Sequence, residues 1–103
     1  MKKFEMTAEI ANPVIYGQEY SIPPYMWDGI ENWVNYGLRP GDFLESILLN
    51  NLVRALQTAD GANFKNLPAY GNLLYNHLPA ECWGSPEKVN AWANQQGLVG
   101  IDR

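Results

Sequence analysis

The sequence has 103 residues, with 11 acidic and 7 basic side chains, a formal net charge of -4 and one cysteine. This length suits a single domain with one core and leaves little room for a deep active-site cavity of its own. The single cysteine excludes a disulfide framework within the chain, and the scattered basic residues argue against direct binding to duplex nucleic acid.

Residues 1–21 are predicted to form an extended N-terminal arm. Phe4, Met6 and Ala8 alternate with polar residues, which is typical of a strand. Asn12-Pro13 indicates a turn, after which Val14-Ile15-Tyr16 would be the return strand of a short N-terminal β-hairpin. Such a hairpin is marginal alone, so we expect it to pack on helices or to pair with another chain.

The N-terminal residues also bear on location. Glu5 and Glu9 fall where a secretory signal needs an apolar stretch. Apolar runs such as Ile47-Leu48-Leu49 are far too short to cross a bilayer. We therefore expect no membrane contact and, with a single cysteine, a cytoplasmic location.

The first predicted helix covers Pro24–Tyr36, with prolines in its first turn and Gly37 ending it. Its apolar side chains recur every three to four residues: Tyr25, Met26, Trp27, Ile30, Trp33 and Val34. Gly29 costs ~1 kcal/mol relative to alanine inside a helix. A close approach of a second helix would explain why a glycine is tolerated there.

The second predicted helix covers Asp42–Thr58 and carries the strongest apolar periodicity of the chain. This stripe consists of Phe43, Leu44, Ile47, Leu48, Leu52, Val53 and Leu56. Asn50 and Asn51 fall in its middle, although asparagine is a mediocre helix former.

Two more helices complete the expected fold. One covers Leu67–Leu78, and the other begins at Pro86, with Ser85 as its N-cap, and stops near Gln96-Gly97. Residues 22–97 are therefore predicted to form a mainly α, four-helix bundle-like domain, followed by a tail at 98–103.

The residue inventory gives little support for catalysis. Cys82 and His77 are the types of a nucleophile and its base, but they equally suit a buried thiol and a helix-end histidine. One Cys and one His cannot build a structural zinc site. We expect no enzyme activity, no metal and no cofactor.

Polar candidates for ligand binding gather around the second helix. The segment Gly37–Asp42 leads into the N-terminus of this helix, where the free backbone amides and Arg39 could bind an anion. The alternative is a helix–helix turn in which Asp42 caps the helix. Asn50, Asn51 and Arg54 lie within about one turn of each other. They suit contact with a base or sugar edge, or a role in fixing the register of neighbouring helices.

The aromatic content is high, with four Trp, six Tyr and three Phe. Because one small core has limited room for such rings, some are expected to anchor a partner, while others lie at the core edge with polar tips in water. Tyr25, Trp27, Tyr75 and Trp83 are the aromatic candidates for ligand or partner binding.

Together these features resemble a family of small phage and mobile-element proteins over about residues 22–92. The matching segments are Ile22-Pro23, Tyr25-Met26, Gly29-Ile30, Trp33-Val34, Gly37-Leu38, Pro40-Gly41, Phe43-Leu44, Leu48, Asn50-Asn51-Leu52, Ala59-Asp60, Asn63, Leu74-Tyr75-Asn76, Pro79 and Cys82-Trp83-Gly84-Ser85. The family commonly has an aspartate where this chain has Asn51, which weakens any charge-dependent role of that position.

The resemblance implies a phage or mobile-element origin, and with it a location in the cytoplasm of a host cell. Accessory proteins of such elements often counter host defence by binding a host protein or a signalling nucleotide. A non-catalytic binding protein of this kind, forming a homo-oligomer, is the first hypothesis. A structural or assembly accessory that binds another phage protein is the second, and a small enzyme is the third.

Overall fold

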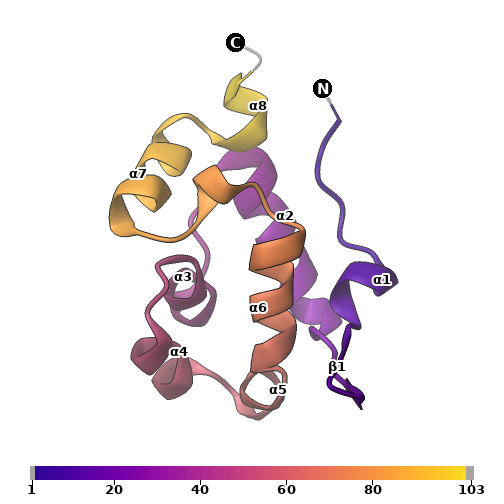
Figure 1. Ribbon diagram of the computed structural model, residues 1–103. Coiled ribbons are helices and arrows are strands. Elements are labelled where there is room, and N and C mark those ends of the chain that lie inside the picture. The colour runs from indigo at the N-terminus through magenta and orange to yellow at the C-terminus, as the bar shows by residue number, and fades with distance from the viewer. Residues whose placement is uncertain (1, 102–103) are drawn as a thin grey trace.

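The computed structural model describes residues 2–101, whose regular structure is almost entirely helical (Figure 1). In the view of Figure 1, α3 and α4 lie on one side of α6, α1 and the hairpin lie on its other side, and α7 and α8 lie toward the end where both termini emerge. The elements are α1 (Ala8–Ala11), β1 (Val14–Ile15), β2 (Gln18–Glu19), η1 (Pro24–Met26), α2 (Trp27–Tyr36), α3 (Asp42–Leu48), α4 (Leu52–Thr58), α5 (Gly61–Lys65), α6 (Leu67–Asn76), η2 (Ala80–Cys82), α7 (Pro86–Asn94) and α8 (Gly97–Ile101).

A short antiparallel hairpin is present, but it is not the one expected. β1 pairs with β2, with Val14 opposite Glu19, and the predicted strand around Phe4–Ala8 is wrong. Tyr16 and Gly17 form the turn with positive φ angles of 50° and 75°, a combination typical of tight hairpin turns.

The N-terminal segment is extended without being a strand, because α2 side chains take the place of a partner strand. Asn35 accepts the Phe4 amide at 2.7 Å and donates to the Phe4 carbonyl at 2.9 Å. Glu31 accepts the Met6 amide at 2.8 Å, after which Thr7 caps α1. The observed alternation of apolar side chains therefore reflects packing on a helix.

The single helix expected at Asp42–Thr58 is broken into α3 and α4. Asn50 has a left-handed φ of 61°, and the Asn51 side chain caps α4 by accepting the Arg54 amide at 3.1 Å. Asparagine favours both the left-handed conformation and the N-cap. Residues 2–101 consequently contain five longer helices rather than the four that we expected.

The close approach expected at Gly29 occurs elsewhere. A Cβ at Gly29 would meet only the Leu44 side chain, at 3.9 Å, so this expectation is wrong. Gly37 ends α2 as predicted, with φ 68°. A Cβ there would lie 2.8 Å from the Trp92 carbonyl oxygen and 2.9 Å from the Gly97 amide.

The C-terminal third agrees with the sequence in part. Ser85 caps α7 as predicted, accepting the Lys88 amide at 3.2 Å, and α6 and α7 each end about two residues before the expected end. Residues 98–101 of the predicted tail belong to α8, which packs against α2. Residues 102–103 lie outside the described residues, and the boundaries at 21 and 97 stay predictions.

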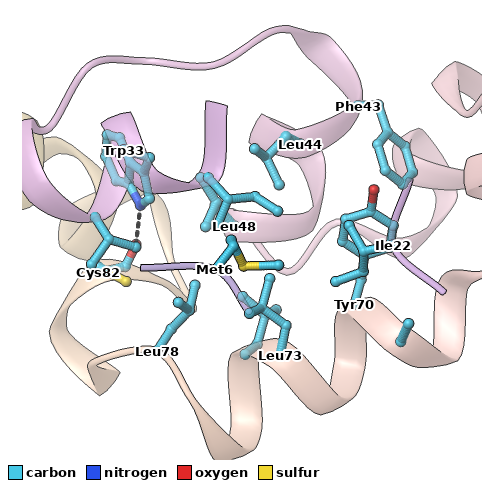
Figure 2. Close-up of a cluster of buried hydrophobic side chains, with 14 of the residues drawn as sticks. Met6, Ile22, Trp33, Phe43, Leu44, Leu48, Tyr70, Leu73, Leu78 and Cys82 are labelled. Carbon is cyan, nitrogen blue, oxygen red and sulfur yellow. Dashed lines mark hydrogen bonds between the residues drawn. The ribbon is translucent and has the colours of Figure 1, made fainter. Parts of the chain in front are cut away.

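Hydrogen bonds from buried indole and phenol groups connect segments of the core. The Trp33 indole donates to the Cys82 carbonyl at 3.0 Å, a bond that Figure 2 marks with a dashed line. The Trp92 indole donates to the Trp33 carbonyl, also at 3.0 Å. Tyr70 meets Phe43 edge-on, with ring centroids 5.1 Å apart, and its hydroxyl donates to Asn63 at 2.6 Å. Within residues 2–101, every helix is too short or too polar to cross a membrane.

Candidate functional site

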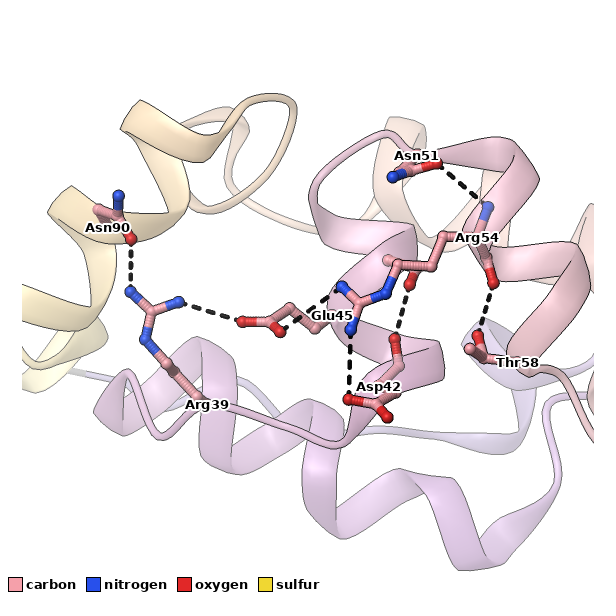
Figure 3. A network of polar contacts seen from close by, with 8 residues as sticks. Arg39, Asp42, Glu45, Asn51, Arg54, Thr58 and Asn90 are labelled. Atoms are coloured by element: carbon pink, nitrogen blue, oxygen red, sulfur yellow. Dashed lines mark hydrogen bonds and ion pairs between the residues drawn. The ribbon is translucent and has the colours of Figure 1, made fainter.

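The two candidate arginines belong to one polar network with Glu45 at its centre (Figure 3). Arg39 lies 3.1 Å from one Glu45 carboxylate oxygen and donates to Asn90 at 2.5 Å. Arg54 lies 3.3 Å from Asp42 and 3.9 Å from the other Glu45 oxygen. Because both guanidiniums are compensated by carboxylates, the network offers little net positive charge to a phosphate.

The candidate asparagines form the turn that separates α3 from α4. Asn50 and Asn51 are both exposed, and they border a shallow pocket of about 180 Å³ between the α3–α4 corner and α6. Leu52 and Leu67 are among its apolar residues. Asn50 supplies the left-handed turn and Asn51 the helix cap, so neither is a buried amide within a helix.

The four candidate aromatic residues do not form one site. Tyr25 and Tyr75 are exposed, at 63% and 83%. Trp27 and Trp83 are partly buried against the core, and the Trp27 indole donates to the Ile22 carbonyl at 3.0 Å. The Trp83 indole nitrogen is buried and has no hydrogen-bond partner among residues 2–101. The two tryptophans are therefore partly committed to packing.

Tyr25 stands at a groove of about 340 Å³ lined by the start of α2, the start of α3 and the α4–α5 junction. Its hydroxyl donates to the carboxylate of Asp60, which also accepts the Asn63 amide at 2.8 Å. These hydrogen bonds lower the pKa of Asp60 and raise that of Tyr25. Sequence reasoning missed Asp60 as a site residue, although its place in Ala59-Asp60-x-x-Asn63 was a usable signal.

The anion site considered at the start of the second helix is not supported. The N-cap of α3 is Gly41, which offers no side chain, and Asp42 is its first helical residue. Asp42 is itself directed to Arg54 (Figure 3). A carboxylate at this helix start repels a phosphate, as the sequence suggested.

Cys82 and His77 lie in different environments. Cys82 is fully buried, and its burial raises the pKa of the thiol to about 12, so the thiolate is disfavoured at neutral pH. His77 is exposed just after the end of α6. Across residues 2–101, no three His, Cys, Asp or Glu side chains gather in a way that could hold a metal ion.

An apolar surface on α4 was not predicted from the sequence. Leu52 and Val53 belong to the apolar stripe of the predicted second helix, yet they are 66% and 65% exposed, and Leu56 is 39% exposed. These three side chains span about 100° of the helix, and we call them the α4 surface. Ala55 is buried and holds α4 against the domain. The turn at Asn50 directs the rest of the stripe outward.

Comparison with known proteins adds no relative: no protein-family model, curated protein or solved structure matches the chain.

Proposed function

We propose that this chain is a non-catalytic binding protein that engages a protein partner through the α4 surface. The observation that carries the proposal is the exposure of Leu52 and Val53, at 66% and 65%, within the most strongly apolar segment of the chain. Burial of such a side chain stabilises by roughly 1.5–3 kcal/mol. Contiguous apolar residues left in water commonly mark an interaction surface.

The resemblance to phage and mobile-element proteins supports a host factor as this partner, in a counter-defence role. A signalling nucleotide has less support, because Arg39 and Arg54 are both paired with carboxylates. Another phage protein as the partner would give the structural or assembly role instead, through the same surface.

Self-association is a second use of the α4 surface. Leu52, Val53 and Leu56 carry no charge, so two copies with a net charge of -4 each could meet there with little local repulsion. Light scattering tests self-association directly, since a homo-oligomer has a mass that is a multiple of the 11.6 kDa of one chain.

The test is quantitative co-purification of tagged chain from a host bacterium. Val53→Asp should lose a specific protein partner while keeping the wild-type circular dichroism spectrum and melting temperature, because position 53 is exposed. Asn94→Asp, which places the same new charge on an exposed position of α7, is the matched control. Equal recovery of every partner by wild type and Val53→Asp would refute the role of the α4 surface.

A further inference from the structure

The groove beside Tyr25 has an apolar floor and an acidic rim. Met26 from η1 and Phe43 and Leu44 from α3 supply apolar lining. Asp42 and Asp60 line the same groove, and both are exposed. Its volume, about 340 Å³, suits a side chain or a small ligand.

Gly29 lines this groove, and a glycine at this position keeps the groove free of a side chain. It lies in the interior of α2, where glycine is unfavourable relative to alanine. Its φ angle is not in the positive range, and the nearest atom to a Cβ there would be the Leu44 side chain at 3.9 Å. Backbone geometry and packing therefore do not require glycine, whereas a side chain at this position would project among the groove-lining residues.

The charge of the groove is one-sided. Among the described residues that line it, there is no Lys, Arg or His. Asp60 stays ionised at neutral pH, since the hydrogen bonds from Tyr25 and Asn63 lower its pKa. Arg54 lies 3.3 Å from Asp42 but does not line the groove, so it neutralises part of the Asp42 charge and leaves Asp60 as the main anionic group of the groove.

We propose that this groove binds a long basic side chain, arginine or lysine, presented by a protein partner. The methylene stem would pack on Met26, Phe43 and Leu44, and the charged tip would reach the Asp42 and Asp60 carboxylates. Long basic side chains commonly bury their stems on apolar surface while the charge stays near water and carboxylates. The exposed Tyr25 ring adds a face suited to a cation.

Charge and composition favour this occupant over a metal ion. A divalent cation needs several clustered oxygen ligands, and no group of three acidic, His or Cys side chains capable of holding a metal occurs within residues 2–101. The apolar side chains of the groove also supply no oxygen ligand to a bare metal ion. The proposal takes from the proposed function only that the partner is a protein, and it concerns a separate surface.

The experiment is a titration of ¹⁵N-labelled chain with the capped peptide Gly-Gly-Arg-Gly-Gly, its lysine analogue and its glutamine analogue, followed by amide chemical shifts. The basic peptides should move the amide signals of Gly29, Gly41 and Asn63 in a saturable way, and the glutamine peptide should bind at least ~5-fold more weakly. Raising NaCl from 50 to 300 mM should weaken the binding of the basic peptides, since salt screens their attraction to the carboxylates.

Two variants separate binding from folding. Asp60→Asn keeps a residue that caps α5 equally well, so it should stay folded and weaken the arginine peptide at least ~5-fold. Gly29→Leu fills the groove with a good helix former and should abolish saturable binding while the chain stays folded. Glu87→Gln, which removes the same charge from an exposed position of α7, should bind as wild type.

Equal binding of the glutamine and arginine peptides, or wild-type affinity of Asp60→Asn, would overturn the proposal. Free methylammonium binding as tightly as the peptides would show a small-amine site and overturn the protein occupant. The titration reports on the groove alone, so its failure leaves the α4 surface untouched, and loss of the α4 partner leaves the peptide result standing.

Discussion

The Cys82 thiol lies in the core close to Trp33, whose indole donates to the Cys82 carbonyl at 3.0 Å. Burial raises the pKa of this thiol from 9.0 to about 12, because the charged thiolate is poorly solvated there. A cysteine could be a nucleophile by residue type, but the buried environment of Cys82 favours a role in core packing.

This pKa shift predicts a loss of stability in alkali. The unfolded chain releases the Cys82 proton near pH 9, whereas the folded chain holds it until about pH 12. The contribution is therefore intact below pH 9 and declines as the pH rises above it. Melting temperatures measured from pH 7 to 11 should fall less steeply for Cys82→Ala than for wild type. Parallel curves for the two proteins would contradict this assignment.

At the scale of the element, the break between α3 and α4 decides which apolar side chains meet the core. The periodicity from Phe43 to Leu56 predicted one helix, since both halves share the same apolar spacing. The competing signal was the pair Asn50-Asn51, which favours a left-handed turn and a cap. Local signals did predict the Gly37 helix end and the Ser85 cap, because each depends on neighbouring residues only.

Substitutions at Asn50 test the break. In a continuous helix, Asn50→Ala would stabilise and Asn50→Gly would destabilise. With Asn50 at φ 61°, we expect the opposite order: Asn50→Ala should cost about 1 kcal/mol and Asn50→Gly should cost nothing or stabilise slightly. Urea unfolding followed by circular dichroism measures both, and the sign for alanine decides between the two structures.

At the scale of the whole molecule, contacts between distant segments are what the sequence could not supply. The amide of Asn35 pairs with the Phe4 backbone, and Gly37 meets Gly97 across α2 and α8. Neither pairing leaves a local pattern. The candidate site was limited in the same way: Tyr25 was predicted, and the segment Ala59-Asp60-x-x-Asn63 marked Asp60, but only the fold shows that Asp60 lies beside Tyr25.

The N-terminal segment should therefore contribute to the stability of the helical domain. Asn35→Ala leaves the Phe4 N–H and C=O without their partner, at a cost of roughly 1–3 kcal/mol. Asn32→Ala, on an exposed position of the same helix, should change stability by less than ~0.5 kcal/mol. Equal unfolding free energies for the two variants would mean that the hydrogen bonds between Asn35 and Phe4 do not stabilise the fold.

The claim on which the proposed function depends is that the outward turn of α4 creates a protein-binding surface. Site-specific photo-crosslinking in a host bacterium tests it most directly, with p-benzoylphenylalanine in place of Val53 and, as a control, of Glu87 on α7. The account predicts a discrete adduct from position 53 alone, and an adduct of twice the chain mass would identify a second copy as the partner. No adduct from position 53, or the same adducts from both positions, would contradict it.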